Sequence, residues 1–264
     1  YNFEEIRADL ISKNYKFNSN TDTEVILNGY IEYKEQIVNK LNGMFAFSIY
    51  DKTNEELFLA RDRSGIKPLY TYHDDKTFTF ASEIKSIKRF SKGIDTNSKI
   101  LFFLLGYIPE PVTIYENIYS FPAGCFGFLK NNKLSIKEFD KYNYEPKINK
   151  PYKEIISDVK ELFNNSIKRH LISDAPIGTF LSGGLDSSII TAVAAQYKTD
   201  LQTLSLVFDE KELSEEKYQD LIVKKYNTKH TKYLINESLF LDNIDDYFKA
   251  MEQPTIDGLN TYFV

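Results

Sequence analysis

The chain has 264 residues, of which 42% are hydrophobic and 27% are charged, a composition typical of a folded globular protein. A formal net charge of −5 disfavours a nucleic-acid partner, and no apolar run reaches the ~18 residues that a membrane helix needs. No signal peptide is visible at the N-terminus. The lone cysteine, Cys125, cannot form an internal disulfide, so we expect a cytoplasmic protein.

Both ends of the sequence are typical of a piece of a longer protein. The chain starts at Tyr1 without a methionine and enters at once a helical pattern made by Ile6, Leu10 and Ile11. It stops inside the apolar segment Asn260–Val264, which has no cap or polar tail. We therefore expect a fragment that is truncated at both ends.

The first part of the chain predicts an α+β domain over residues 1–145. Helices are expected over 3–13, 22–41 and 97–105, the second of them behind a Thr21-x-x-Glu24 capping box. Short alternating segments separated by turns predict an antiparallel meander of strands. The expected strands are 44–50, 56–61 and 77–81, followed by a hairpin of 124–129 with 134–136 around Asn131-Asn132.

The second part of the chain predicts an α/β domain over residues 152–264. The segment 141–153 contains two prolines and little periodicity, so it is the expected linker. Helical and strand patterns then alternate, which predicts a parallel sheet whose ligands lie at the carboxyl ends of its strands. The expected helices are 153–170, 187–197, 214–226 and 237–250, and the expected strands are 177–181, 204–208 and 231–235.

The most informative motif is Ser182-Gly183-Gly184-Leu185-Asp186-Ser187-Ser188, between a predicted strand and a predicted helix. Glycines allow a sharp turn with inward N–H groups, the helix start adds positive charge, and the hydroxyls add donors. Ser182, Gly183, Gly184, Ser187 and Ser188 therefore predict a phosphate cradle. Asp186 would repel phosphate unless a cation lay between them, so the motif predicts Mg²⁺ on Asp186. The alternative is a capped strand–helix connection without a ligand.

The motif resembles the pyrophosphatase-type loop of ATP-dependent amide and amidine ligases, which split ATP between its α and β phosphates. Further motifs, in order, resemble the glutamine-hydrolysing asparagine synthetases. They are Gly43–Phe47, Arg61–Tyr70, Phe80–Ser86 and Phe121–Gly124 in the glutaminase half, and then Ser182–Ser188 in the synthetase half. Residues 253–263 look like the bacterial branch that includes surface-polysaccharide amidotransferases. The resemblance covers nearly the whole chain.

The resemblance implies an N-terminal-nucleophile glutaminase-like domain followed by an ATP-pyrophosphatase-like domain. The implied reaction turns aspartate, ATP and glutamine (or ammonia) into asparagine, AMP and pyrophosphate through a β-aspartyl-AMP intermediate, with ATP and Mg²⁺ as cofactors. Two alternatives stay open: another carboxylate acceptor, such as a polysaccharide, and a non-catalytic nucleotide-binding partner. The expected partners are the small-molecule substrates, with neither nucleic acid nor membrane, and a homodimer is left open.

The resemblance also implies the roles of individual residues. Leu181, Leu206 and Val207 would flank the adenine, although a place in the sheet core explains them equally well. Asp22 matches the acid that holds the α-ammonium group of glutamine; the alternative is a helix-terminus acid. The catalytic cysteine of the family, its asparagine–glycine pair and its arginine are absent from this sequence, and Cys125 is no substitute because it has no free α-amine. Arg61, Asp62 and Lys67 are expected to be structural.

Overall fold

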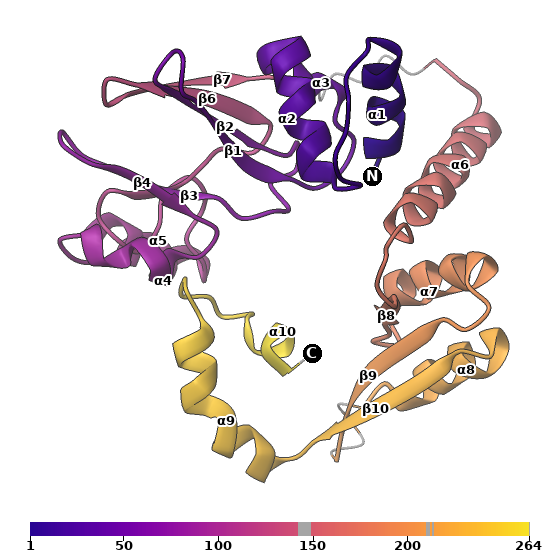
Figure 1. Cartoon of the computed structure of the whole chain (residues 1–264). Coiled ribbons are helices and arrows are strands. Elements are labelled where there is room, and N and C mark those ends of the chain that lie inside the picture. The colour runs from indigo at the N-terminus through magenta and orange to yellow at the C-terminus, as the bar shows by residue number, and fades with distance from the viewer. Residues whose placement is uncertain (142–148, 210–211, 213, 264) are drawn as a thin grey trace. The chain divides into compact units, whose positions relative to one another are not determined.

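The computed structural model describes residues 1–141, 149–209, 212 and 214–263. The chain divides into two compact units (Figure 1): residues 1–145 with 252–256, and residues 146–251 with 257–264. The domain boundaries expected from the sequence, 1–145 and 152–264, stay a prediction, and most of the expected linker lies outside the described residues. None of the described helices is long and apolar enough to cross a membrane.

The helices of the first unit follow the predicted pattern with two differences: the helix expected over 22–41 is divided, and the helix at Ile84–Ile87 was not predicted. They are α1 (Phe3–Ser12), α2 (Asp22–Tyr33), α3 (Ile37–Lys40), α4 (Ile84–Ile87) and α5 (Thr96–Leu105). The expected helix over 22–41 is therefore wrong as one element, since the chain turns at Lys34, where φ is +52°. A Cβ on Gly29 would lie 2.5 Å from the side chain of Ile37, so this glycine lets α3 fold back closely on α2.

The start of α2 contains half of the expected capping box. The Thr21 hydroxyl accepts a hydrogen bond from the Glu24 N–H at 3.3 Å. The Glu24 carboxylate, however, accepts from the backbone N–H groups of Asn18 and Ser19 and from the Ser19 hydroxyl. These bonds, the Ser19 hydroxyl first, lower the pKa of Glu24. Glu24 thus closes the loop that leads into α2.

Two antiparallel sheets complete the first unit, which confirms the α+β fold class. One has the order β1-β2-β6-β7 and the other the order β4-β3-β5. The expected single meander is wrong, because the strand predicted at 77–81 pairs with β3, which the sequence did not predict. The strands are β1 (Ala46–Asp51), β2 (Glu56–Arg61), β3 (Tyr70–His73), β4 (Phe78–Ala81), β5 (Ile118–Ser120), β6 (Cys125–Lys130) and β7 (Lys133–Glu138).

Aromatic side chains fill the core of the first unit. Phe58 of β2 is fully buried, and its ring lies 4.9 Å from that of Tyr30 and 5.2 Å from that of Phe128. Burial of so much aromatic surface packs α2 against the four-stranded sheet. The predicted hairpin between β6 and β7 turns at Asn131 and Asn132, whose φ angles of +49° and +56° match a type I′ turn.

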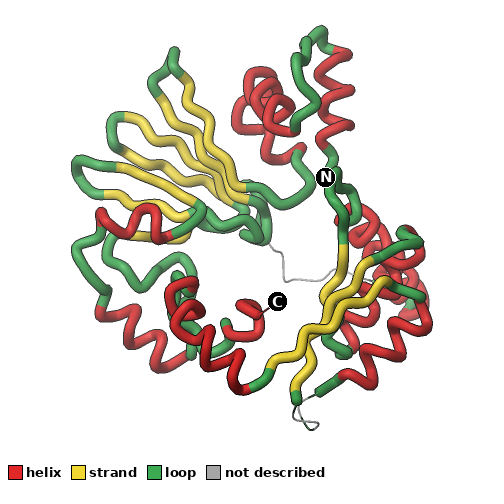
Figure 2. The backbone as a smooth tube through the Cα atoms, turned by 60° about the horizontal axis from the view of Figure 1, so that its bottom comes forward, coloured by secondary structure: helices red, strands yellow, loops and turns green. Residues whose placement is uncertain are grey.

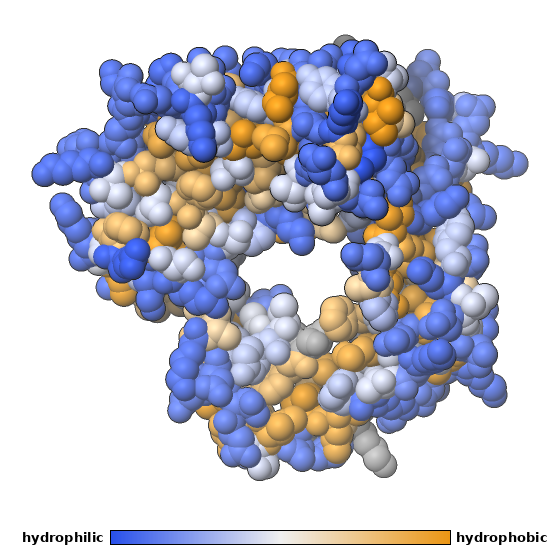
Figure 3. Space-filling model, viewed as in Figure 1, coloured by the Kyte–Doolittle hydropathy of each residue, from blue (hydrophilic) through white to orange (hydrophobic). Residues whose placement is uncertain are grey.

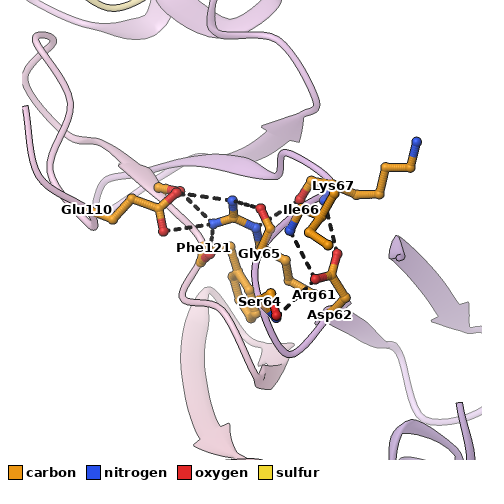
Figure 4. A network of polar contacts seen from close by, with 9 residues as sticks. Arg61, Asp62, Ser64, Gly65, Ile66, Lys67, Glu110 and Phe121 are labelled. Atoms are coloured by element: carbon orange, nitrogen blue, oxygen red, sulfur yellow. Dashed lines mark hydrogen bonds and ion pairs between the residues drawn. The ribbon is translucent and has the colours of Figure 1, made fainter. Parts of the chain in front are cut away.

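A polar turn with two buried charged side chains carries the chain from β2 to β3 (Figure 4). Asp62 is 1% exposed, and its carboxylate accepts hydrogen bonds from the backbone N–H groups of Phe45, Ser64, Ile66 and Lys67. Arg61 is 4% exposed and donates to Glu110, Ser120 and three backbone carbonyls. Figure 4 shows the Lys67 side chain directed away from this network. Of the three residues expected to be structural, Arg61 and Asp62 are confirmed in that role, whereas Lys67 takes part in this network only through its backbone N–H and carbonyl.

A short distant segment, residues 252–256, also belongs to the first unit. The Glu252 carboxylate accepts from the backbone N–H groups of Ile84 and Lys85 at 2.9 and 3.0 Å. The side-chain oxygen of Gln253 accepts from the Ile114 N–H at 2.9 Å, and the Ile256 N–H donates to the Gly106 carbonyl. These contacts attach the segment 252–256 to the first unit, and the sequence patterns did not predict this attachment.

The second unit contains the predicted parallel sheet, with the order β10-β9-β8 and both pairs parallel. Figure 1 shows α7 and α8 along one side of this sheet, and Figure 2 shows its three strands side by side. The α/β fold class is confirmed. The strands are β8 (Gly178–Phe180), β9 (Gln202–Phe208) and β10 (Lys229–Ile235), and the helices are α6 (Tyr152–His170), α7 (Leu185–Tyr197), α8 (Glu216–Tyr226), α9 (Glu237–Ala250) and α10 (Leu259–Phe263).

The core of the second unit is small. Ile167, Ala194 and Leu201 form a buried cluster between α6, α7 and the start of β9. The same helix α6 exposes Val159 and Leu162 to 58% and 69%. Apolar patches interrupt the hydrophilic surface in the space-filling view (Figure 3). Helix α6 is thus buried only toward its C-terminal end, at Ile167.

Candidate nucleotide-binding site

The Ser182–Ser188 loop lies where a parallel sheet binds ligands. It begins after Leu181, directly beyond the last residue of β8, and its second half forms the first turn of α7. Leu181 extends the strand by donating its N–H to the Leu204 carbonyl at 2.8 Å. The loop therefore joins the carboxyl end of a strand to the N-terminus of a 13-residue helix, where N–H groups and the helix dipole favour an anion.

Gly183 makes the sharp turn at the start of this loop. Its φ angle is +93°, a conformation that residues with a Cβ rarely adopt. A Cβ built there would lie 3.0 Å from both the Cβ and the carbonyl oxygen of Glu215, just before α8. Gly184 follows as the N-cap of α7 without a side-chain cap. The two glycines thus bring the backbone close to α8 and leave the start of α7 open.

The loop hydroxyls are held in position by one another. Ser182 Oγ lies 2.9 Å from Ser187 Oγ, and the backbone N–H of Ser182 donates to Ser187 Oγ at 3.2 Å. The Gly184 N–H donates to Ser182 Oγ, and Ser187 Oγ donates to the Gly184 carbonyl, both at 3.2 Å. Most of these contacts are solvent-exposed, so the hydroxyls can exchange them for a ligand at little cost. Ser188 lies half-buried one residue further into α7.

Asp186 is exposed in the first turn of α7. The described residues contain no group of three or more His, Cys, Asp or Glu side chains that could hold a metal by themselves. A single exposed carboxylate nevertheless fits Mg²⁺, because this ion commonly binds through one or two carboxylates together with substrate phosphates and water. Asp209 lies exposed just beyond β9, whereas Glu210 is outside the described residues.

The residues expected to flank the adenine lie at the same edge of the sheet. Leu181 is 1% exposed and Val207 is 8% exposed, so both also belong to the sheet core. Leu206 lies beside Val207 in β9 and is half-buried. One further residue, Gln219 of α8, donates its side-chain amide to the Ser182 and Leu206 carbonyls. The sequence did not predict a role for Gln219, because a single glutamine in an amphipathic helix is typical of a surface residue.

Asp22 lies apart from this loop, in the first unit. It is the first residue of α2 and is exposed, with Thr21 as its N-cap. It also lines a cavity of about 540 Å³ between α2 and β1, together with Phe45, Lys67, Ser82 and other residues. Asp22 is thus both a helix-terminus acid and a carboxylate open to a cavity of ligand size. Cys125, by contrast, is buried, and burial raises the pKa of its thiol, which disfavours the reactive thiolate.

Comparison with known families separates the two parts of the chain. A model of the glutamine amidotransferase domain family matches residues 1–142. The chain belongs to this family. A model of the asparagine synthase family matches residues 158–264, which include the whole Ser182–Ser188 loop. The resemblance drawn from the sequence motifs to glutamine-hydrolysing asparagine synthetases is confirmed.

Curated relatives match this chain over its whole length. Asparagine synthetase [glutamine-hydrolyzing] 1 of Bacillus subtilis is 32% identical over 270 residues, which cover 100% of this chain and 42% of the relative. The putative asparagine synthetase [glutamine-hydrolyzing] 2 of Methanocaldococcus jannaschii is 35% identical over 276 residues, covering 100% and 52%. This chain spans about half the length of these relatives.

A solved structure, the glutamine phosphoribosylpyrophosphate amidotransferase from B. subtilis complexed with ADP and GMP, covers 97% of this chain and 50% of its own. Its TM-score is 0.37, and its sequence is 14% identical to this chain.

Proposed function

We propose that this chain is part of an ATP-dependent ligase that makes asparagine from aspartate, with glutamine or ammonia as the nitrogen source. Residues 1–145 would be part of a glutaminase domain and residues 152–264 part of the ATP-binding domain. The observation that carries the proposal is the Ser182–Ser188 loop, at the carboxyl end of a parallel strand and inside the asparagine synthase match.

In the proposed first step, a β-carboxylate oxygen of aspartate attacks the α-phosphorus of ATP. The bond between the α-phosphorus and the bridging oxygen breaks, and pyrophosphate leaves with its electron pair. The cradle of Ser182, Gly183, Gly184, Ser187 and Ser188 would hold the leaving pyrophosphate, whose growing charge the donors of a preorganised loop stabilise. Leu181, Leu206 and Val207 would flank the adenine.

In the second step, ammonia attacks the acyl carbon of β-aspartyl-AMP, AMP leaves, and the nitrogen loses a proton. Asp22 would hold the α-ammonium group of the glutamine that supplies this ammonia. Its position on the cavity between α2 and β1 supports the assignment. The product is asparagine, together with AMP and pyrophosphate.

Asp186 would hold Mg²⁺ beside the phosphates. A bound Mg²⁺ supplies charge that offsets the negative phosphates and the leaving pyrophosphate. The exposed carboxylate at the start of α7 supports this assignment, because without a cation it would repel a polyphosphate bound to the neighbouring N–H groups.

Asp186→Ala tests the proposal through aspartate-dependent ATP–pyrophosphate exchange. We expect the exchange to be abolished while the unfolding transition stays unchanged, because Asp186 is exposed. Asp200→Ala is the matched control, since this carboxylate of the same unit is 71% exposed and pairs only weakly with Lys229 at 3.7 Å. Exchange that survives in Asp186→Ala at the control level would contradict the metal assignment.

Aspartate is the acceptor that the relatives favour, since those reported above are named asparagine synthetases. Product analysis with aspartate, ATP and ammonia tests this choice against another carboxylate. A cytosolic location completes the proposal and rests on the single cysteine. The homodimer stays a prediction, which sedimentation of the protein would test.

A further inference from the structure

We infer that Gln219 is a positioning residue that holds the ends of β8 and β9 together beside the proposed nucleotide site. The inference rests on the proposed function, since it concerns the site in which ATP would bind. It begins from the place where the two parallel strands separate. Their ladder pairs Gly178 with Gln202 and Phe180 with Leu204, and β8 ends there.

Two backbone carbonyls lie just beyond this end of the ladder. Ser182 and Leu206 are each two residues past the last paired residues, Phe180 and Leu204. Gln219 reaches both from α8: its Nε2 lies 3.2 Å from the Ser182 carbonyl oxygen and 3.1 Å from the Leu206 carbonyl oxygen. One side-chain amide therefore bridges the two strands where they no longer bond to each other directly.

The chemistry of the amide fixes its orientation. Two carbonyl oxygens accept hydrogen bonds and do not donate, so the group between them must be the NH₂, which has two hydrogens to give. The Oε1 atom then faces away. It is buried without a hydrogen-bond partner among the described residues, in a side chain that is only 1% exposed. A buried acceptor without a partner destabilises the fold, so packing alone does not explain a glutamine at this position.

The start of α8 and the loop are in close contact at a second point. A Cβ on Gly183 would lie 3.0 Å from Glu215 and 3.3 Å from the Cβ of Tyr218, the residue before Gln219. Ser205 of β9 meanwhile donates its hydroxyl to the Leu181 carbonyl. The end of β8, the end of β9 and the start of α8 thus form one unit, and Gln219 is the side chain that contacts both strand ends.

This arrangement predicts a particular pattern of ligand affinities. In the proposed site, ATP would extend from the ends of β8 and β9 to the loop, so its binding would depend on both strand ends that Gln219 holds. Inorganic pyrophosphate would contact the loop alone, whose Ser182–Ser187 hydroxyl contacts are separate from the Gln219 bond to the Ser182 carbonyl. Loss of the Gln219 amide should therefore weaken ATP more than pyrophosphate.

Gln219→Met tests the inference, because methionine has a similar length and shape but no N–H donors. Affinities for the α,β-methylene analogue of ATP and for pyrophosphate, each with MgCl₂, are measured by calorimetry on the whole chain. We expect the analogue to bind roughly tenfold more weakly and pyrophosphate to lose less than about threefold, as expected for two lost hydrogen bonds. Gln196→Met is the matched control, since this exposed amide of α7 donates only to a carbonyl of its own helix.

Gln219→Glu provides a second arm if the methionine variant does not fold. A glutamate at this site carries a donor only when it is protonated, so affinity for the analogue should recover as pH falls. In the unchanged chain, the side-chain amide signals of Gln219 in an NMR spectrum should shift when the analogue binds, and those of Gln196 should not.

The outcomes separate the two proposals. Failure of the unchanged chain to bind the analogue overturns the proposed function. Binding by the unchanged chain, together with equal losses for both ligands or no loss in Gln219→Met, overturns the role of Gln219. In the absence of a folded variant, amide signals of Gln219 that do not move when the analogue binds also overturn it.

Discussion

Two polar turns of this chain are built in opposite ways. The segment from Arg61 to Lys67, at the end of β2, buries two of its charges: Asp62 is 1% exposed and accepts four backbone N–H groups, and Arg61 is 4% exposed and pairs with Glu110. The Ser182–Ser188 loop follows β8 and keeps Ser182 and Asp186 at the surface. Its hydroxyls bond mainly to one another and to the loop backbone.

The difference separates a structural turn from a binding turn. Both are rich in charged or hydroxyl side chains and both follow a strand, so residue type alone does not separate them. A buried charge must have all its partners within the protein, which leaves nothing for a ligand. An exposed hydroxyl held by weak neighbouring contacts can exchange them for an anion. Substitutions in the first turn should therefore affect stability, and substitutions in the second should affect binding.

Asp62→Ala should have the largest effect on stability. Removing the buried carboxylate takes away the shared acceptor of four backbone N–H groups that fix the turn, which should lower the free energy of unfolding by about 3 kcal/mol or more. Asp51→Ala is the control, because Asp51 accepts similar bonds in a solvent-exposed turn and should cost about 1 kcal/mol or less. Urea unfolding measures both. Equal losses would erase the distinction between the two turns.

Gly183→Ala should come next, with about 2 kcal/mol lost from the second unit. The positive φ angle disfavours a Cβ, and the Cβ would press on the backbone and side chain of Glu215. Gly93→Ala is the control, since no atom lies within 4 Å of its added Cβ. Thermal unfolding that moves equally in both variants would show that the loop is not closely packed against α8.

Ser187→Ala should mainly change nucleotide affinity. One hydroxyl among several donors contributes about 0.5–1.5 kcal/mol, so the KM for ATP in the exchange reaction should rise roughly three- to tenfold. Ser238→Ala, in the first turn of α9, removes an exposed hydroxyl of the same unit and should leave KM unchanged. A loss of stability without a change in KM would make the Ser182–Ser188 loop a structural turn like the first one.

His230 should give the smallest effect, through pH. Burial lowers its pKa, with the positive charge of Lys232 acting in the same direction and Thr203 and Asp220 opposing it. Because the unfolded state takes up the proton first, the stability of the second unit should fall as pH drops below the ordinary value of 6.5. His230→Gln should flatten this dependence in urea unfolding between about pH 7.5 and about pH 5.5.

The sequence predicted the elements that local patterns determine. The loop with its flanking strand and helix, the Asn131-Asn132 hairpin and the alternation after residue 152 depend on neighbouring residues, and they are present. The strand β3 was missed because it is only four residues long, although it forms a local hairpin with β4 and also pairs with the distant β5. The turn at Lys34 was missed because a lysine with a positive φ leaves no local pattern, and the close approach of Ile37 to Gly29 is visible only in the folded chain.

The candidate site divides in the same way. Motif and chain order identified the Ser182–Ser188 loop, whereas Gln219 lies 37 residues from Ser182 in the sequence and reaches it only in the folded unit. The sequence also could not predict the hydrogen bonds of Glu252 and Gln253 to the first unit, since their partners lie 139 or more residues away. Long-range polar contacts of this kind leave no periodic trace in a sequence.

A crystal structure of the chain grown with AMP, pyrophosphate and MgCl₂ tests the central claim most directly. The account predicts pyrophosphate at the N-terminus of α7, within hydrogen-bonding distance of the N–H groups and hydroxyls of the Ser182–Ser188 loop, with AMP beside Leu181 and Val207. Pyrophosphate bound at another place in a well-ordered crystal, with the loop keeping its Ser182–Ser187 contact, would contradict it.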